Sequence, residues 1–179
     1  MNANVTVTLA GTKPARPPII TLLVDVQLKN DDKVARWALI PSKLPVDTGG
    51  GGIDKLEQLT AQAGTTSVAV GRFLGTGGRY AIRLAPGARV ALRKLPIAWW
   101  RGDTNDKQVA FDVQLASEVK LGGAAMASWF SADPTIGGAV DVDVEAAKHT
   151  ASHRAPEDKE QPVEVTGATA VHVKLDALR

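Results

Sequence analysis

The 179-residue sequence predicts an all-β fold, an antiparallel β-sandwich of about ten short strands with at most one short helix. Apolar and polar side chains alternate with a period of two in most of the apolar segments, which is typical of strands that bury one face. Short segments rich in Gly, Pro, Asn and Asp separate these stretches, as turns separate strands. The length suits one domain over residues 1–179, with a core large enough to fold without disulfides or metals.

The first strands show the most regular alternation. Residues 5–9 alternate valine or leucine with threonine, and residues 22–29 alternate along their whole length. The Asn and Asp residues at 30–32 predict a turn, because both residue types tolerate left-handed backbone. A third strand is predicted over residues 36–40, and Pro41 ends it.

The single predicted helix is short. Ile53, Leu56 and Leu59 are spaced by three after a run of glycines at 49–52. This spacing allows one or two helical turns with Asp54 near the N-terminus, where a carboxylate is favourable.

The second half of the chain returns to alternation. Further strands are predicted around residues 80–84, 90–92, 109–115, 140–144 and 171–175. The stretch 146–162 contains no large apolar residue, so it predicts a polar insertion that forms a long exposed loop or a partly ordered excursion from the sheet. We therefore expect that deleting residues 148–159 leaves the fold intact.

Two segments resemble parts of known sandwiches. The segment Leu23 to Pro41, a strand, an Asn-Asp-Asp turn and a strand that carries a tryptophan, resembles the early strands of immunoglobulin-like domains. The segment Leu84 to Ala88 is similar to the Pro-Gly turns between strands of such domains. Many sandwiches share these patterns, so the resemblance implies a β-sandwich, either immunoglobulin-like or jelly-roll-like, and identifies no family.

Composition excludes several classes of protein. The chain has no cysteine, which excludes disulfide frameworks, thiolate metal sites and cysteine nucleophiles. The N-terminus lacks a basic segment followed by an apolar run, and the longest apolar stretch, 19–28, is too short for a membrane helix. We expect a soluble, cytoplasmic protein, with non-classical export as the alternative. The net charge of +2 is too balanced to indicate nucleic-acid binding by the whole chain.

The sequence lacks the common signatures of enzymes. No Gly-x-Ser-x-Gly motif occurs, and the glycines at 75–78 are followed by a predicted strand rather than a helix that could bind phosphate. We therefore expect no enzymatic activity and no cofactor. The carboxylates of Asp103, Asp106 and Asp112, whose spatial pairing the sequence does not reveal, leave an unrecognised enzyme as an alternative.

The histidines offer one candidate metal site. Glu145, His149 and His153 recur at intervals of four, so on a helix they would form a stripe able to hold zinc or nickel. The simpler interpretation is a solvated loop that contains two histidines, and we expect no metal. His172, the third histidine, is predicted on the outward face of the last strand.

The strongest charge feature is a run of six cations with no acidic residue among them. Its members are Arg72, Arg79, Arg83, Arg89, Arg93 and Lys94. Alternation predicts that four of them, at 79, 83, 89 and 93, face outward. The turn at Pro86-Gly87 is not of the type that closes tight hairpins, so its two strands can belong to different sheets and divide the cations between two surfaces.

Four tryptophans are the other candidates for binding. In the adjacent pair Trp99 and Trp100, strand geometry places the two rings on opposite faces, so we expect one to pack inside and the other to be exposed or covered by a loop. Core packing is the default for Trp37 and Trp129, and an exposed tryptophan would indicate a binding site.

These features together favour a non-enzymatic binding, accessory or assembly subunit that docks onto another macromolecule. The expected partner is another protein or a second copy of the chain. One alternative is a lectin-like module in which an exposed tryptophan stacks on a sugar. The other is a module whose arginine-rich face binds anionic lipid or another polyanion.

Overall fold

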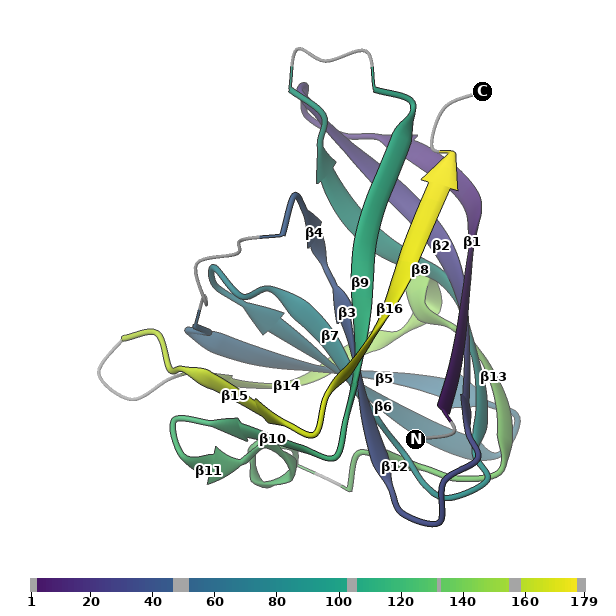
Figure 1. Cartoon of the computed structure of the whole chain (residues 1–179), viewed down its shortest axis with the longest axis vertical. Coiled ribbons are helices and arrows are strands. Elements are labelled where there is room, and N and C mark those ends of the chain that lie inside the picture. The colour runs from purple at the N-terminus through teal and green to yellow at the C-terminus, as the bar shows by residue number, and fades with distance from the viewer. Residues whose placement is uncertain (1–2, 47–51, 103–105, 132, 155–158, 177–179) are drawn as a thin grey trace.

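The computed structural model describes residues 3–46, 52–102, 106–131, 133–154 and 159–176, and most of them lie in strands (Figure 1). The strands are β1 (Ala3–Pro14), β2 (Ile19–Asn30), β3 (Arg36–Pro41), β4 (Lys43–Leu44), β5 (Lys55–Ala63), β6 (Thr66–Leu74), β7 (Arg79–Leu84), β8 (Arg89–Trp100), β9 (Gln108–Ala116), β10 (Glu118–Leu121), β11 (Ala124–Ala125), β12 (Thr135–Ile136), β13 (Ala139–Asp143), β14 (Lys148–Arg154), β15 (Val163–Thr166) and β16 (Thr169–Asp176). The predicted all-β class is confirmed.

In the described residues, helical structure is limited to two 3-10 turns, η1 (Met126–Trp129) and η2 (Val144–Ala146). Within the part of the chain that the structure describes, no helix is long and apolar enough to cross a membrane.

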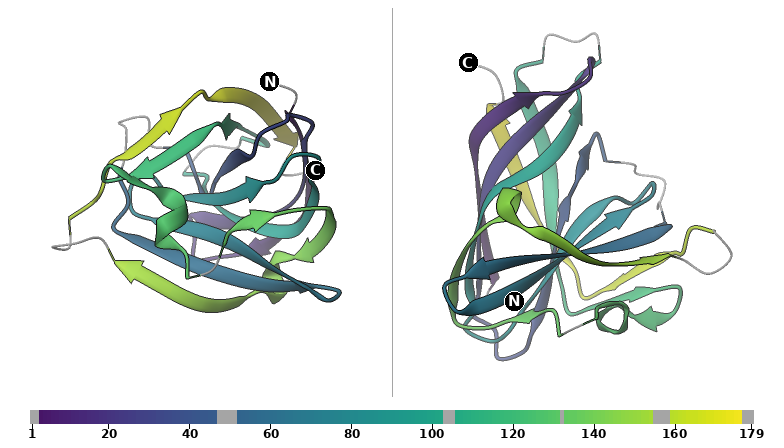
Figure 2. Two further views of the ribbon diagram at one scale, coloured as in Figure 1. Left: turned by 90° about the horizontal axis from the view of Figure 1, so that it is seen from below. Right: turned by 180° about the vertical axis from the view of Figure 1, so that it is seen from behind.

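The strands form three sheets. The first sheet has the order β1-β2-β8-β13, with β4 also paired to β8. The large sheet has the order β14-β5-β6-β7-β3-β9-β16, with β12 paired to β7, and the small sheet has the order β11-β10-β15. Most neighbouring strands are antiparallel, while β4 and β13 pair with β8, and β12 with β7, in parallel. The small sheet lies at the lower left in Figure 1 and at the lower right in the view from behind (Figure 2).

The main core lies between the first sheet and the large sheet. Alternate residues of β2, β7, β8 and β9 fill it, including Leu22, Ile82, Leu92 and Val113, none of which is exposed. These are positions that the period of two predicts to be buried. The sandwich therefore forms from the strands whose alternation is clearest.

A second core lies on the other face of the large sheet, under the small sheet and η1. Trp37, Phe73 and Phe130 are among its buried members, and the rings of Trp37 and Phe130 have centroids 6.3 Å apart. Gly71 on β6 makes room for this packing, because a Cβ there would lie 2.6 Å from Cζ of Phe130. Where the small sheet covers it, the large sheet is buried on both faces.

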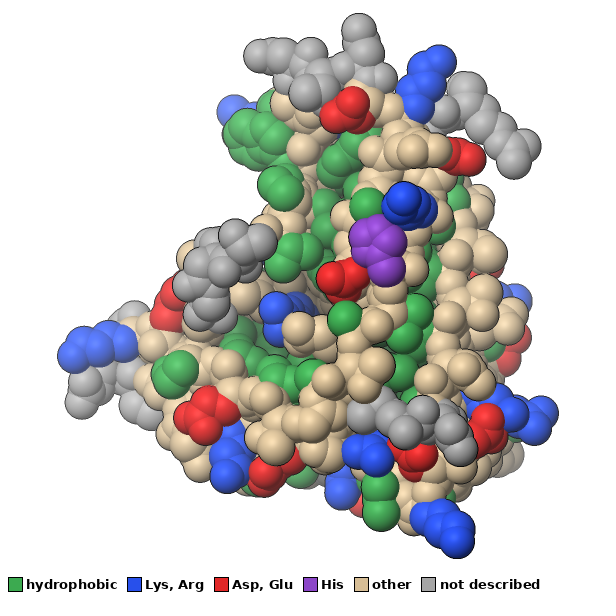
Figure 3. All heavy atoms as spheres, viewed as in Figure 1, with side chains coloured by type: hydrophobic (Ala, Val, Ile, Leu, Met, Phe, Trp, Pro, Cys, Tyr) green, Lys and Arg blue, Asp and Glu red, His purple; other side chains and the backbone are tan. Residues whose placement is uncertain are grey.

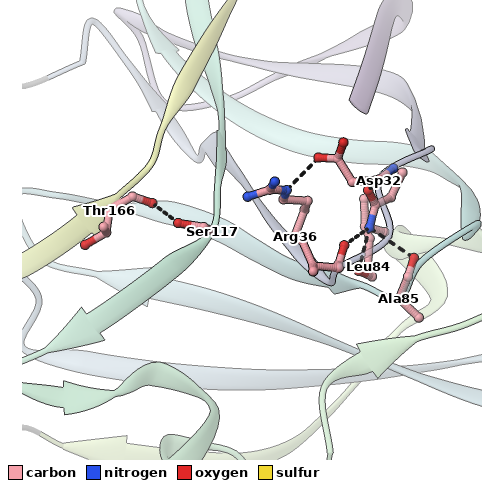
Figure 4. A network of polar contacts seen from close by, with 8 residues as sticks. Asp32, Arg36, Leu84, Ala85, Ser117 and Thr166 are labelled. Carbon is pink, nitrogen blue, oxygen red and sulfur yellow. Dashed lines mark hydrogen bonds and ion pairs between the residues drawn. The ribbon is translucent and has the colours of Figure 1, made fainter. Parts of the chain in front are cut away.

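Hydrogen bonds join the small sheet to Ser117, the residue that follows β9. Ser117 donates both its backbone N–H and its hydroxyl to the carbonyl of Thr166, at 3.0 and 2.8 Å (Figure 4). The four residue pairs between β10 and β15 continue from this point. The second core is thus stabilised by apolar packing and by the short backbone pairing of β10 with β15.

The predicted helix over 53–59 is wrong. Lys55–Ala63 forms β5, and Ile53 makes an isolated bridge to Gln161. Leu56 packs into the second core and Leu59 against the main core, so they point to opposite faces of one strand. Because both faces of β5 meet an apolar core, its apolar residues lack the simple alternation that would have revealed a strand.

The prediction of a long loop over 146–162 is also wrong for part of its length. Lys148–Arg154 forms β14, which pairs antiparallel with β5 at the edge of the large sheet. The pairing includes side chains, since the hydroxyl groups of Thr60 and Thr150 lie 2.8 Å apart. An edge strand that faces solvent needs no large apolar residue, so hydrophobicity alone did not reveal it. Residues 155–158 lie outside the described part of the chain.

Deleting residues 148–159 is now expected to destabilise the fold, by about 3 kcal/mol or more. β14 pairs with β5 from Thr60 to Lys55, and Gln161 pairs with Ile53 just before β5. The deleted segment therefore covers a distance of about 20–30 Å, at roughly 3.3 Å per residue. Equilibrium urea unfolding measures the loss. Replacing the same residues with a Gly-Ser segment of equal length restores the span without the pairing, so it should cost less than the deletion. Unchanged unfolding of the deletion variant would contradict a structural role for β14.

The predicted turn at 30–32 is built around one buried amide. Asn30 is fully buried, and its Nδ2 donates to the carbonyls of Val34, Leu84 and Ala85 at 2.9, 3.1 and 3.1 Å. Its Oδ1 accepts the backbone N–H of Asp32 at 3.1 Å. The carbonyls of Leu84 and Ala85 converge at this point in Figure 4. One side chain therefore joins the end of β2 in the first sheet to the end of β7 in the large sheet.

Candidate binding surfaces

The six cations between residues 72 and 94 do not form one surface. β7 lies in the large sheet and β8 in the first sheet, and the connection between them contains Gly87 with a φ of 76°. The sequence left open whether these two strands share a sheet, and the structure places them in different sheets. Arg79 and Arg83 therefore belong to a different face from Arg89 and Arg93.

The cations on the first sheet are largely neutralised by β13. Arg93 pairs with Asp141 at 2.7 Å, and Lys94 pairs with Asp143 at 3.0 Å. The hydrogen bond from Lys94 lowers the pKa of Asp143 below its ordinary value. Arg89 is exposed and has no acidic partner among the residues that the structure describes. This face therefore has little excess positive charge.

Arg72 lies on the same face of the large sheet as Tyr80, its partner in the pairing of β6 with β7. Its Nη1 lies 3.7 Å from Glu57, a carboxylate that also contacts Lys55. Burial raises the pKa of the Tyr80 hydroxyl, which donates to the carbonyl of Pro96. Arg72, whose side chain is 41% exposed, is thus already paired with a carboxylate.

Arg79 and Arg83 lie on the outer face of the large sheet, yet both are half-buried. Arg83 donates to the hydroxyl of Thr135 at 2.9 Å, and Arg79 donates to Oε1 of Gln114 at 3.2 Å. Their expected direction is correct, because their neighbours Tyr80 and Ile82 face the main core. The sequence did not predict their partial burial, because their partners Gln114 and Thr135 are distant from them in the chain.

The tryptophans divide as the sequence predicted. Trp99 is 6% exposed and packs into the main core, whereas Trp100 is 58% exposed. Trp37 is buried in the second core, and Trp129 packs against the same core. Trp100 is the most exposed large hydrophobic residue within the described ranges, ahead of Val34 at 53%.

An apolar groove adjoins Trp100, and we call it the Trp100 groove. It has a volume of about 610 Å³ and is lined by Ile19, Lys43, Leu44, Pro45, Val46, Ala98 and Trp100. Strand pairing places these residues together, because Ile19 of β2 lies opposite Trp100 and Lys43 of β4 lies beside Ala98. Figure 3 shows hydrophobic side chains gathered at the upper end of the molecule, where β2 begins and β8 ends.

A second hollow, which we call the Arg79 pocket, lies on the outer face of the large sheet. Its volume is about 320 Å³, and its lining comprises Leu39, Pro41, Pro45, Val46, Arg79, Ala110, Phe111, Asp112, Gln114 and His172. Figure 3 shows the front of the molecule hollowed beside β9, with a basic side chain inside the hollow. Pro45 and Val46 line both hollows.

The stripe of Glu145, His149 and His153 does not form, because no helix forms there. His149 and His153 lie on β14, and Glu145 lies in η2 and pairs with Lys13. His172 contacts Asp112 at 2.8 Å on neighbouring strands. No group of three or more metal-ligating side chains gathers among the described residues, and Asp103 lies outside them.

Sequence reasoning identified Trp100 but missed the residues that form its groove. Leu44, Pro45 and Val46 precede a glycine-rich segment and show no alternation, so nothing local signals that they reach β8. Comparison with protein-family models, with curated proteins and with solved structures found no significant match. The geometry of the two hollows is therefore the basis for assigning a function.

Proposed function

We propose that this chain is a non-enzymatic binding module that docks onto another protein through the Trp100 groove. The observation that carries the proposal is the exposure of Trp100, 58%, beside an apolar groove rather than singly on a polar surface. An exposed indole costs free energy in water, and tryptophan is enriched among the residues that dominate protein interfaces.

The lining of the groove favours a protein partner over a sugar. A sugar site needs several polar side chains around the aromatic ring to bind hydroxyl groups. Lys43 is the sole charged residue among those that line the groove, and its Nζ already donates to the carbonyl of Gly75 at 2.7 Å. Aliphatic and proline side chains form the rest, which suits an apolar side chain of a partner.

The distribution of charge argues against a polyanion. Arg93 and Lys94 are paired with carboxylates, and Arg79 and Arg83 lie on a different sheet. Exposed, paired charges attract a polyanion weakly, because the neighbouring carboxylates repel it. The groove supports docking independently of these arginines.

Site-specific photo-crosslinking tests the proposal in the source cells. We expect a photoreactive amino acid in place of Lys43 to give a discrete covalent adduct with a protein, because Lys43 lines the groove. Adding Trp100→Ser should abolish the adduct, since loss of an interface tryptophan costs about 2 kcal/mol or more, roughly 30-fold in affinity. An adduct of twice the chain's mass would identify the partner as a second copy.

Two controls keep the result specific. The same photoreactive group at Val34, which is exposed away from the groove, should give no such adduct. The melting temperature of the Trp100→Ser variant should match that of the wild type, because the ring is mostly exposed. Absence of an adduct at 43, or its persistence in the Trp100→Ser variant, would refute the proposal. Retention on a glycan array that depends on Trp100 would favour the lectin-like alternative instead.

A further inference from the structure

The Arg79 pocket is built by four neighbouring strands. In the large sheet, Arg79 of β7 lies opposite Pro41 of β3, and Leu39 of β3 lies opposite Gln114 of β9. One step further, Asp112 of β9 lies opposite His172 of β16. Register thus brings a guanidinium, an amide and an acid–imidazole pair onto one face, although they are up to 93 residues apart in the sequence.

Among the residues that the structure describes, no carboxylate forms an ion pair with the guanidinium in this pocket. Arg79 is half-buried, and its one hydrogen-bond partner among the described residues is the neutral amide oxygen of Gln114, at 3.2 Å. Burial lowers the pKa of Arg79 below its ordinary value. Two other arginines contrast with it, since Nε of Arg36 and of Arg93 each lies 2.7 Å from a carboxylate.

The nearby carboxylate of Asp112 is not the counter-ion of Arg79. Asp112 lines the same pocket, but its Oδ1 contacts Nδ1 of His172 at 2.8 Å, and no ion pair joins it to Arg79. A guanidinium has five N–H donors in a fixed fork that matches a carboxylate. Within the described ranges, Gln114 is the one side chain that accepts a hydrogen bond from Arg79.

The rest of the lining is apolar. Leu39, Pro41, Pro45, Val46 and Ala110 contribute to its walls, whereas the side chain of Phe111 packs into the main core. A volume of about 320 Å³ is at the small end of the range for ligand pockets, roughly 300–1,000 Å³. The pocket thus combines one partly desolvated cation with room for a small apolar body.

We propose that the Arg79 pocket binds an organic carboxylate with a compact apolar body, and that the carboxylate pairs with the Arg79 guanidinium. Gln114 Nε2, on the amide that already accepts from Arg79, is positioned as a further donor. This site is separate in chemistry from protein docking at the Trp100 groove, and each stands if the other fails.

Titration with matched probes tests the site. We expect 3-phenylpropionate to bind saturably and to shift the Nε–Hε signal of Arg79 in nitrogen-proton correlation spectra. The affinity for its neutral amide should be at least about tenfold lower, because the charge-assisted pair is lost. An acetylated peptide that ends in a free phenylalanine carboxylate forms a second arm, and tighter binding of the peptide would identify a protein terminus as the source of the carboxylate.

Three variants complete the test. Arg79→Gln should lose about tenfold or more in affinity for 3-phenylpropionate, while Arg83→Gln, on the same strand and face, should bind as the wild type does. Gln114→Glu keeps Arg79 and supplies an internal carboxylate, so it should block the acid even if Arg79→Gln fails to fold. Equal binding of acid and amide, undiminished binding by Gln114→Glu, or an equal loss in Arg83→Gln would overturn the proposal.

Discussion

We expect replacement of Asn30 by alanine to lower the free energy of unfolding by about 3 kcal/mol, because each buried polar group left without a partner costs about 1–3 kcal/mol. The amide of Asn30 serves the carbonyls of Val34, Leu84 and Ala85 and the N–H of Asp32. The expected fall in melting temperature is about 10 °C for a chain of this size. Thermal and urea unfolding followed by circular dichroism measure both quantities.

The neighbouring residue provides a matched control for Asn30. Asp31 contacts Lys29 at 2.7 Å, and both side chains are more than one third exposed. Asp31→Ala should therefore change the free energy of unfolding by less than about 1 kcal/mol, the range measured for surface ion pairs. A similar loss in both variants would show that the Asn30 amide does not hold the two sheets together.

The second large effect is expected in the second core. Phe130→Ala should lower the free energy of unfolding by about 3 kcal/mol, as removal of a buried phenylalanine ring does. The ring is 8% exposed and packs beside Trp37 and over Gly71. The loss should be local, so hydrogen exchange should accelerate first in β10, β11 and β15, while β2 and β8 stay protected.

A double-mutant cycle makes this prediction specific. Gly71→Ala alone should destabilise, because the added Cβ would lie 2.6 Å from Cζ of Phe130. In the Phe130→Ala background the same change should cost little, since the clashing ring is absent. Ser128→Ala, in the exposed part of η1, serves as the control for the segment. Additive effects of Gly71→Ala and Phe130→Ala would contradict their contact.

The sequence predicted those strands that bury one face and leave the other in water. Residues 22–29 and 109–115 alternate because one set of side chains enters the main core and the other is more exposed. Prediction failed where this condition fails. β5 has apolar neighbours on both faces, and β14 lies at an edge with almost no apolar side chain.

The candidate sites likewise include features that the sequence predicted and features that it could not predict. Trp99 and Trp100 lie on opposite faces because they are adjacent on one strand, so the sequence predicted that one would be buried. It could not predict the partial burial of Arg79, or that Arg79 forms no ion pair with a carboxylate of the described residues. Those depend on how β3, β7 and β9 align and on where Pro45 and Val46 pass.

By itself, then, the sequence determined the all-β class and the turn at Asn30, because alternation and turn chemistry act between residues close together in the chain. Only the tertiary structure decided that Trp100 is the exposed ring, that β4 builds a groove beside it, and that Arg79 lies in a pocket where its described hydrogen-bond partner is the neutral Gln114. Each of these depends on strands that are distant in sequence, and their pairing is set by the total apolar area buried rather than by any local pattern.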